Sequence, residues 1–202
     1  MIDIAKEGYP YIILSLFTGV VFWTFFPVAS FVAVLVAFAL AWFFRDPVRT
    51  TSVDTGAIIS PADGKIVSIE SINENRAKRI SIYLSLFDVH INRAPVSGTV
   101  KNIVYTPGSF FAAFKNEARR SNENNLIGFD CSGLEYKVRQ VAGSVARKIV
   151  CNCREGQQVV RGEKIGMIKF GSCVQLEVPD QVGLQIKIGD KVKAGETIIG
   201  VV

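Results

Sequence analysis

The chain has 202 residues, of which 49% are hydrophobic, and a formal net charge of +5 at pH 7. This length allows one domain or two small ones, and the apolar content is high for a soluble domain. The positive charge is modest, and no interleaving of aromatic and basic residues accompanies it. We therefore exclude a nucleic acid as partner.

An uncharged segment dominates the N-terminal part of the chain. Residues 10–44 contain no charged side chain. One helix of that length would extend about 52 Å, whereas the hydrocarbon core of a bilayer is about 30 Å thick. Pro27, near the middle of the segment, favours a turn. We expect a helical membrane hairpin with helices over 10–26 and 28–44. Each is about 17 residues long, so a re-entrant hairpin remains the alternative to a spanning one.

The charges that flank the hairpin predict its orientation. Lys6 precedes the uncharged segment, and Arg45 and Arg49 follow it. A hairpin brings both flanks to one side, and basic residues favour the cytoplasmic side of a membrane. We expect a protein of the cell membrane whose remaining chain lies in the cytoplasm. The cysteines then lie in a reducing compartment, where disulfides are rare; they are Cys131, Cys151, Cys153 and Cys173.

Residues 51–202 predict a β-rich domain, which leaves residues 1–50 as a separate membrane anchor. After a short linker, the chain consists of short runs of β-branched residues bounded by Gly, Pro or Asn. One further segment, at 109–120, predicts a short helix with Ser109 as its N-cap. The expected strands are 57–60, 65–69, 79–84, 98–105, 135–141 and 144–150.

The last fifty residues contain an internal repeat. Residues 156–165 recur as 189–198, with Gly, Val, Gly, Glu and Ile at matching positions. This pattern resembles the half-barrel sandwich of biotinyl and lipoyl carrier domains. Such a fold implies that the segment between the two halves is a tight, exposed hairpin. We therefore expect Gly171 and Ser172 at an exposed turn on a small β scaffold.

Three residues are candidates for nucleophilic chemistry. The Ser172 hydroxyl can attack the Gly171 carbonyl if a base activates it, and His90 is the only histidine. Asp63 can orient the imidazole, with Asp88 as the rival for that role. Each residue also has a purely structural interpretation. Gly-Ser is a common turn pair, a lone histidine is often structural, and Asp63 lies in an ordinary Pro-x-Asp-Gly turn.

Other chemistry has weaker support in the sequence. Cys151 and Cys153 are too closely spaced for a usual zinc site, and their partners are scattered, so we expect no metal. Cys173 has no adjacent positive residue to activate its thiol. Lys169 lies near the position of the modified lysine in carrier domains, but the residues around it do not match their pattern.

Taken together, four features resemble the phosphatidylserine decarboxylase family, in its short, membrane-anchored branch. They are the N-terminal apolar hairpin and residues 60–64 (SPADG), 87–95 (FDVHINRAP) and 169–172 (KFGS). The similarity covers most of the chain. Each feature is weak alone, but the combination is specific.

The resemblance implies a proenzyme that cleaves itself between Gly171 and Ser172, into a β chain (1–171) and an α chain (172–202). Ser172 would become a pyruvoyl group, the covalent cofactor of a carboxy-lyase that converts phosphatidylserine to phosphatidylethanolamine. The family's Asp-His-Ser set corresponds to Asp63, His90 and Ser172. Long members carry a second histidine where this chain has Arg93. We therefore regard Arg93 as a candidate for holding the phosphate or carboxylate of the membrane phospholipid substrate.

Two alternatives to this function remain. One is an archaeal-type archetidylserine decarboxylase, because an ether-linked lipid has the same headgroup and no residue identifies the lipid chains. The other is a non-catalytic, membrane-anchored carrier module of the lipoyl or biotinyl type. The sequence leaves the oligomeric state open, with a homo-oligomer among the options.

Overall fold

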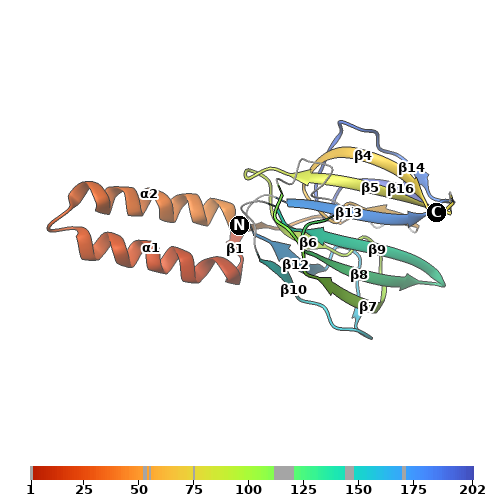
Figure 1. Cartoon of the computed structure of the whole chain (residues 1–202), viewed down its shortest axis with the longest axis horizontal. Coiled ribbons are helices and arrows are strands. Elements are labelled where there is room, and N and C mark those ends of the chain that lie inside the picture. Colours follow the sequence, from red (N-terminus) through yellow and green to blue (C-terminus); the bar gives the residue numbers. More distant parts are fainter. Residues whose placement is uncertain are drawn as a thin grey trace. The chain divides into compact units, whose positions relative to one another are not determined.

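The computed structural model describes residues 2–51, 54, 56–74, 76–111, 121–143, 148–169 and 172–202. The chain divides into two compact units, Met1–Val48 and Arg49–Val202 (Figure 1). The first unit is helical, and the second consists of β-strands. The two units are described separately below.

The N-terminal unit is a pair of helices joined by a short turn. Strands β1 (Ile2–Ile4) and β2 (Arg45–Pro47) pair antiparallel, and a short 3-10 helix, η1 (Lys6–Gly8), leads into α1 (Tyr9–Phe22). Helix α2 (Pro27–Phe43) begins at a proline, which suits the first helical turn because its missing N–H needs no partner there. Two helices joined by a turn are therefore present where they were predicted, with Pro27 at the start of the second; their role as a membrane hairpin stays a prediction.

Small and hydroxyl-bearing residues hold the two helices together. Ser30 Oγ donates to the Gly19 carbonyl at 2.6 Å, and Ser15 Oγ donates to the Ala33 carbonyl at 2.7 Å. Both bonds join one helix to the other. With 14 and 17 residues, the helices extend about 21 and 26 Å. Within the described part of the chain, neither helix combines the length and apolarity that a membrane crossing requires.

The second unit consists of one large sheet and two small ones. The eight-stranded sheet has the order β11-β7-β8-β9-β13-β5-β4-β15, and the small sheets have the orders β10-β12-β6 and β14-β16-β3. The strands are β3 (Ala57–Ile59), β4 (Gly64–Ile72), β5 (Ala77–Leu84), β6 (Ile91–Arg93), β7 (Gly98–Thr106), β8 (Asn124–Cys131), β9 (Leu134–Val141), β10 (Ile149–Cys151), β11 (Gln158–Val159), β12 (Lys164–Ile168), β13 (Ser172–Pro179), β14 (Gly183–Leu184), β15 (Lys191–Val192) and β16 (Ile198–Val201). All their pairings are antiparallel.

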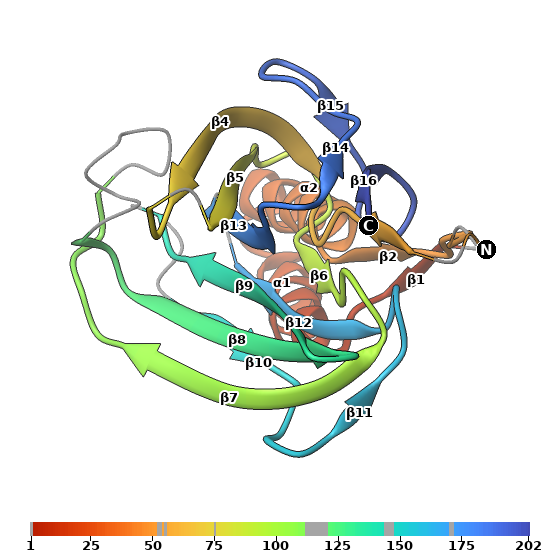
Figure 2. The same cartoon turned by 90° about the vertical axis from the view of Figure 1, so that its right-hand side faces the viewer.

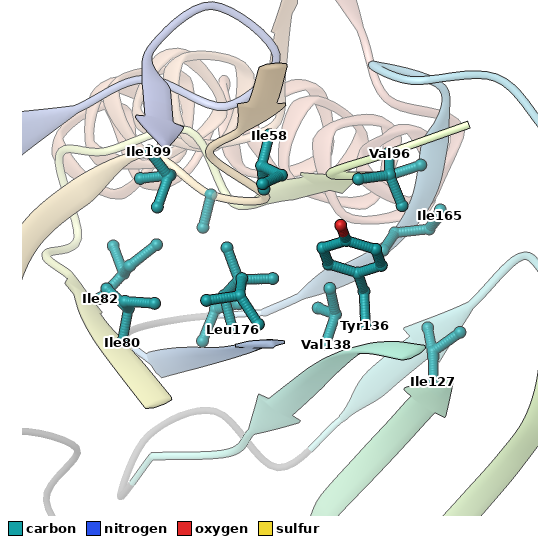
Figure 3. Packing of buried hydrophobic residues seen from close by; sticks show 14 of the residues in the cluster. Ile58, Ile80, Ile82, Val96, Ile127, Tyr136, Val138, Ile165, Leu176 and Ile199 are labelled. Carbon is teal, nitrogen blue, oxygen red and sulfur yellow. The ribbon is translucent and has the colours of Figure 1, made fainter. Parts of the chain in front are cut away.

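The large sheet curls into a half-barrel (Figure 2). Alternate residues of its central strands are fully buried on the inner face, as the period of two in a strand requires. Figure 3 shows Ile80, Ile82 and Leu176 of the curled sheet facing Ile58 and Ile199 of a small sheet. The core therefore lies between the half-barrel and the small sheets, as expected for a mainly β half-barrel domain.

The sequence repeat is also a structural repeat. Gly162 N donates to the Ala94 carbonyl at 2.9 Å, and Gly195 N donates to the Ser60 carbonyl at 2.9 Å. The same turn is thus bonded to the same position in each half. The glycines of the repeat all have positive φ, which favours glycine at these positions; they are Gly156 (79°), Gly162 (86°), Gly189 (101°) and Gly195 (81°).

Two parts of the secondary structure differ from the prediction or lie outside the described residues. Strand β8 was not predicted from the sequence. The helix expected over 109–120 falls largely on residues 112–120, outside the described residues, although Ser109 forms an isolated bridge with Asn122.

The expected hairpin between β12 and β13 is wrong. The edges of β12 pair with β10 and β6, and those of β13 pair with β5 and β9, so the two strands belong to different sheets and have no free edge for each other. The connection passes from one sheet to another, and Ser172 is buried rather than exposed.

Candidate functional site

Ser172 is the first residue of β13 and is fully buried. It lies opposite Leu84 of β5, and both side chains belong to the inner face of the half-barrel. Its Oγ has no hydrogen-bond partner among the described residues. A buried hydroxyl without a partner is costly and rare. Gly171, the other half of the predicted cleavage site, lies outside the described residues.

Gln140 marks the level at which the chain crosses between the sheets. On β9 it lies directly opposite Val174 of β13. It also reaches the small sheet, because a Cβ placed on Gly166 of β12 would lie 2.9 Å from Gln140 Nε2. The chain therefore meets Gln140 both before and after the crossing. Ile168 follows Gly166 by two residues and Ser172 precedes Val174 by two, so both residues belong to the stretch of chain that joins the two sheets.

His90 is bonded through its backbone to Ile168, four residues before Ser172 in the sequence. Its carbonyl accepts a hydrogen bond from Ile168 N at 3.2 Å. The side chain is fully buried just before β6. On β6, which follows, Asn92 contacts the half-barrel, and Ala94 lies in the core just after it. The only imidazole of the protein is thus buried in the same β domain as Ser172.

A backbone contact selects the tautomer of His90. Nδ1 lies 2.9 Å from the Asp88 carbonyl oxygen. A carbonyl only accepts, so Nδ1 carries the hydrogen and Nε2 keeps its lone pair. The turn that presents this carbonyl is itself fixed, because Asp88 Oδ2 accepts bonds from Ser85 N at 2.8 Å and Ser85 Oγ at 2.6 Å. In the neutral form of a ring held this way, the lone pair lies on Nε2, the nitrogen that we assign as the base under the proposed function.

Asp63 precedes β4 and is held by two partners. Oδ1 accepts from Ala194 N at 2.7 Å, and Oδ2 accepts from Arg49 Nη2 at 2.7 Å. Among the described residues, these are the hydrogen-bond partners of its carboxylate, and His90 is not one of them. Burial raises the pKa of the Asp63 carboxyl above its ordinary value. The Ala194 N–H and the Arg49 charge oppose that shift without cancelling it, and the charge of Asp88 adds to it.

The other half of the repeat shows which contact of Asp63 is purely structural. Ser97 occupies the corresponding turn in the other half, and its Oγ accepts from Arg161 N at 2.9 Å. Asp63 Oδ1 makes the same turn contact with Ala194 N. Only the second oxygen, its charge and its pairing with Arg49 distinguish Asp63 from a turn-capping residue.

Comparison with known proteins identifies the family of the chain. The profile of the phosphatidylserine decarboxylase family matches residues 36–200. The chain is 40% identical to the phosphatidylserine decarboxylase proenzyme of Desulfotalea psychrophila, over 98% of this chain and 96% of that protein. The chain belongs to the phosphatidylserine decarboxylase family. It is also 41% identical to the proenzyme of Syntrophus aciditrophicus, over 98% and 96% of the two chains. Identity to the proenzyme of Chlorobium phaeobacteroides is 43%, over 83% and 81%.

Arg49 is a residue of this decarboxylase-family site whose role sequence reasoning missed. Only 7% of its side chain is exposed, and it bridges Asp63 at 2.7 Å and Glu196 at 3.4 Å. In the sequence it followed an apolar segment, where basic residues usually indicate membrane orientation. No local pattern connects it to Asp63, 14 residues later.

Arg93 is half-buried in this family member, and its Nη1 donates to the Gly162 carbonyl at 2.9 Å. Its role as a substrate ligand remains a prediction. Lys169, the residue that a carrier domain would modify, is 7% exposed. A carrier lysine must reach other enzymes, so this burial favours the decarboxylase family over the carrier alternative. Cys151 and Cys153 lie at and just beyond the end of β10, where the Cys153 thiol lowers the pKa of Cys151 to about 6.

Proposed function

We propose that this chain is a phosphatidylserine decarboxylase proenzyme that cleaves itself between Gly171 and Ser172. The observation that carries the proposal is the buried, unpartnered Ser172 Oγ, in the same β domain as the buried His90 that is bonded to Ile168 of β12. Relatives named as such proenzymes, aligned over 98% of the chain, support the same assignment.

The first step needs only groups of the chain itself. His90 Nε2 takes the proton of Ser172 Oγ, and the oxygen attacks the Gly171 carbonyl carbon. The bond from that carbon to the Ser172 nitrogen breaks, the nitrogen takes a proton, and an ester replaces the amide. A base then removes the Ser172 Cα proton, and the ester leaves as a carboxylate at Gly171. Hydrolysis of the dehydroalanine releases ammonia and leaves a pyruvoyl group.

The surroundings of Ser172 fit such a group. Leu84 and Val174 line the same inner face, so the position is dry. We assign the buried His90 as the titratable side chain that acts there. When formed, the pyruvoyl carbonyl supplies an electron sink for loss of carbon dioxide. In the lyase reaction, we assign His90 as the group that returns a proton to the substrate carbon. Asp63 would favour the charged imidazole, and Arg93 would hold the substrate phosphate or carboxylate.

The helical hairpin supports membrane association. Large apolar side chains are exposed around both helices rather than along one stripe, for example Phe17 (64%), Val20 (74%) and Phe31 (64%). A helix that is apolar all round is suited to lipid surroundings. We propose that the hairpin inserts into the cytoplasmic face of the cell membrane, which would bring the lipid headgroup to the enzyme.

The lipid chains remain a matter for assay. Ester-linked phosphatidylserine is the substrate we propose, and ether-linked archetidylserine is the second candidate because both have the same headgroup. Release of carbon dioxide from vesicles of each lipid, measured with one enzyme preparation, distinguishes them.

Intact mass of the purified protein tests the proposal. We expect two chains, 1–171 and 172–202, with the smaller lighter by one ammonia than an unmodified serine terminus predicts. Ser172→Ala should leave one chain. Ser81→Ala is the matched control, because Ser81 is equally buried on the neighbouring strand and its Oγ accepts from Gln175 Nε2; it should cleave normally. An unbroken wild-type chain of 22.1 kDa, correctly folded, would overturn the proposal.

A further inference from the structure

Exposed apolar side chains gather at one end of the large sheet, where β5, β7 and β9 finish and β8 and β13 begin. Among the described residues of Arg49–Val202, eight large hydrophobic residues are exposed, and five of them lie at this end. A group of such residues marks an interaction surface, whereas single ones are common on any protein. We call these five residues the apolar end: Leu86, Phe87, Val104, Tyr105 and Phe111.

Leu86 and Phe87 form the tip of a turn that directly follows β5, and β5 ends opposite Ser172. The turn is closed, because Asp88 N donates to the Ser85 carbonyl at 3.1 Å and Asp88 Oδ2 accepts from Ser85 N at 2.8 Å. The two side chains at the tip are 51% and 80% exposed. A rigid turn therefore presents two large apolar side chains to the surroundings close to the start of β13.

Phe111 is held on the other side of β13. Asn122 Oδ1 accepts from Phe111 N at 2.8 Å, and Asn122 Nδ2 donates to the Ala142 carbonyl at 2.7 Å. Ala142 follows Val141, which lies opposite Cys173 of β13. Since β13 lies between β5 and β9 (Figure 1), its first residues have exposed apolar side chains on both flanks.

The loops at the opposite end of the same sheet are polar. In the described part of the loops that follow β4, β8 and β13, the one large apolar side chain is Val182, which is buried. The other described residues of these loops are Asn73, Glu74, Arg76, Ser132, Gly133, Asp180 and Gln181. The apolar end is therefore a property of the end at which Ser172 lies, not of the whole sheet.

A positive charge accompanies the apolar end. Lys148 is exposed, and its carbonyl accepts from Lys169 N at 3.2 Å, directly after β12. Aromatic side chains favour the interface between a bilayer and water, and basic side chains near a bilayer are attracted to anionic lipid. The combination fits the surface of a bilayer that contains anionic phospholipid.

We propose that the apolar end is a second membrane-contact surface, which inserts Leu86 and Phe87 into the headgroup region of such a bilayer. The inference rests on the proposed function, in which the headgroup of a membrane lipid must reach the buried Ser172. Contact through the apolar end places the start of β13 next to the headgroups. The lipid chains then stay in the bilayer during the reaction.

The test places a single tryptophan in the full-length chain, after Trp23→Phe and Trp42→Phe have removed the two native ones. Phe87→Trp reports on the apolar end. Gln181→Trp is the matched control, because Gln181 is also exposed but follows the far end of β13, which has 8 residues and extends about 26 Å. Each variant is reconstituted in vesicles of phosphatidylcholine and phosphatidylglycerol, with or without bromine on the lipid chains.

We expect the emission of Phe87→Trp to lie at shorter wavelength and to be quenched by brominated lipid, and that of Gln181→Trp to show neither effect. Leu86→Trp is the second reporter if Phe87→Trp folds poorly. In the chain with its native tryptophans, Phe87→Ser should lower carbon dioxide release from phosphatidylserine vesicles about tenfold, because a large apolar contact is lost. Self-cleavage, read by intact mass, should be unchanged in Phe87→Ser.

Absence of quenching in folded Phe87→Trp overturns the proposal, and so does equal quenching of Phe87→Trp and Gln181→Trp. A shift of the Phe87→Trp emission that depends on protein concentration without vesicles assigns the surface to a second copy of the chain, which also overturns it. Self-cleavage of the wild type separates the two levels of inference. If the wild type cleaves and Phe87→Trp is not quenched, only the membrane contact fails; if the folded wild type does not cleave, the proposed function fails.

Discussion

Arg49 Nη2 lies 2.7 Å from Asp63 Oδ2, and both side chains are nearly buried, at 7% and 12% exposure. Removing one member of a buried ion pair leaves the other charge uncompensated, at a cost of about 3 kcal/mol or more. We therefore expect Arg49→Met to lower the free energy of unfolding at pH 7 by about 3 kcal/mol, measured by urea denaturation.

The loss of stability caused by Arg49→Met should depend on pH. Burial already raises the pKa of Asp63 above its ordinary value of 3.8, and Arg49 opposes that rise, so the variant raises the pKa further. Because the folded-state pKa of Asp63 is raised, its carboxyl destabilises the fold only when it is ionised. This destabilisation appears as pH rises from 3.8 through the folded-state pKa. The difference between variant and wild type should shrink toward pH 4. Arg79→Met is the control, since the Arg79 side chain, which pairs with Glu177, is 28% exposed compared with 7% for Arg49. An equal loss in both variants would contradict this prediction.

Asp63→Asn tests whether the charge of Asp63 serves His90. Asparagine keeps the oxygen that accepts from Ala194 N, so the turn is preserved, but the carboxylate is lost. We expect self-cleavage to slow by about 100-fold or more, because the imidazolium formed during proton transfer loses its counter-charge. A time course of chain separation on a denaturing gel measures the rate.

Ser97→Ala provides the control for that variant, because it removes the corresponding turn contact in the other half of the repeat and should leave cleavage unchanged. If Asp63→Asn cleaves as fast as the wild type, Asp63 is a turn residue only.

Cys151 should react with alkylating reagents at an unusually low pH. Interaction with the Cys153 side chain lowers the pKa of Cys151 to about 6, against an ordinary value of 9.0, while the pKa of Cys153 is raised. We expect iodoacetamide to label Cys151 with a midpoint near pH 6 and Cys153 far more slowly, as read by peptide mass mapping.

Cys153→Ala should move the Cys151 midpoint back to alkaline pH. A lowered thiol pKa stabilises the fold above the unfolded value and loses that effect as pH falls through about 6. The wild type should therefore gain stability over Cys153→Ala as pH rises from about 6 to 9. Identical pH profiles of labelling for Cys151 and Cys153 would contradict the prediction.

Trp23 reports on membrane insertion of the hairpin. It lies just after α1 and is 73% exposed. The chain has two tryptophans, so Trp42→Phe leaves Trp23 as the only one. We expect its emission to shift to shorter wavelength and to be quenched by brominated lipid on addition of vesicles containing anionic phospholipid, because the indole leaves water.

Trp23→Phe, which keeps only Trp42, is the companion variant that compares the far end of the hairpin with its base. Unchanged Trp23 emission with vesicles would count against insertion.

Much of the site was accessible from the sequence because its residues are chemically unusual. His90 is the only histidine, and the repeated glycines mark turns whose positive φ depends on local geometry alone. The two helices follow from the uncharged segment and Pro27. In each case neighbouring residues determine the outcome, since sterics and apolar periodicity act over a few positions.

Only the tertiary structure decided which distant residues meet. Strand β8 begins with two asparagines and contains Gly128, so its strand character comes from pairing with β7 and β9 rather than from local preference. The burial of Ser172 follows from β12 and β13 having both edges occupied. The pairing of Arg49 with Asp63 likewise depends on the folded arrangement of the chain, because neither residue lies in a strand. Local sequence determined the turns and the candidate chemistry, whereas long-range strand pairing decided which of those groups became buried together.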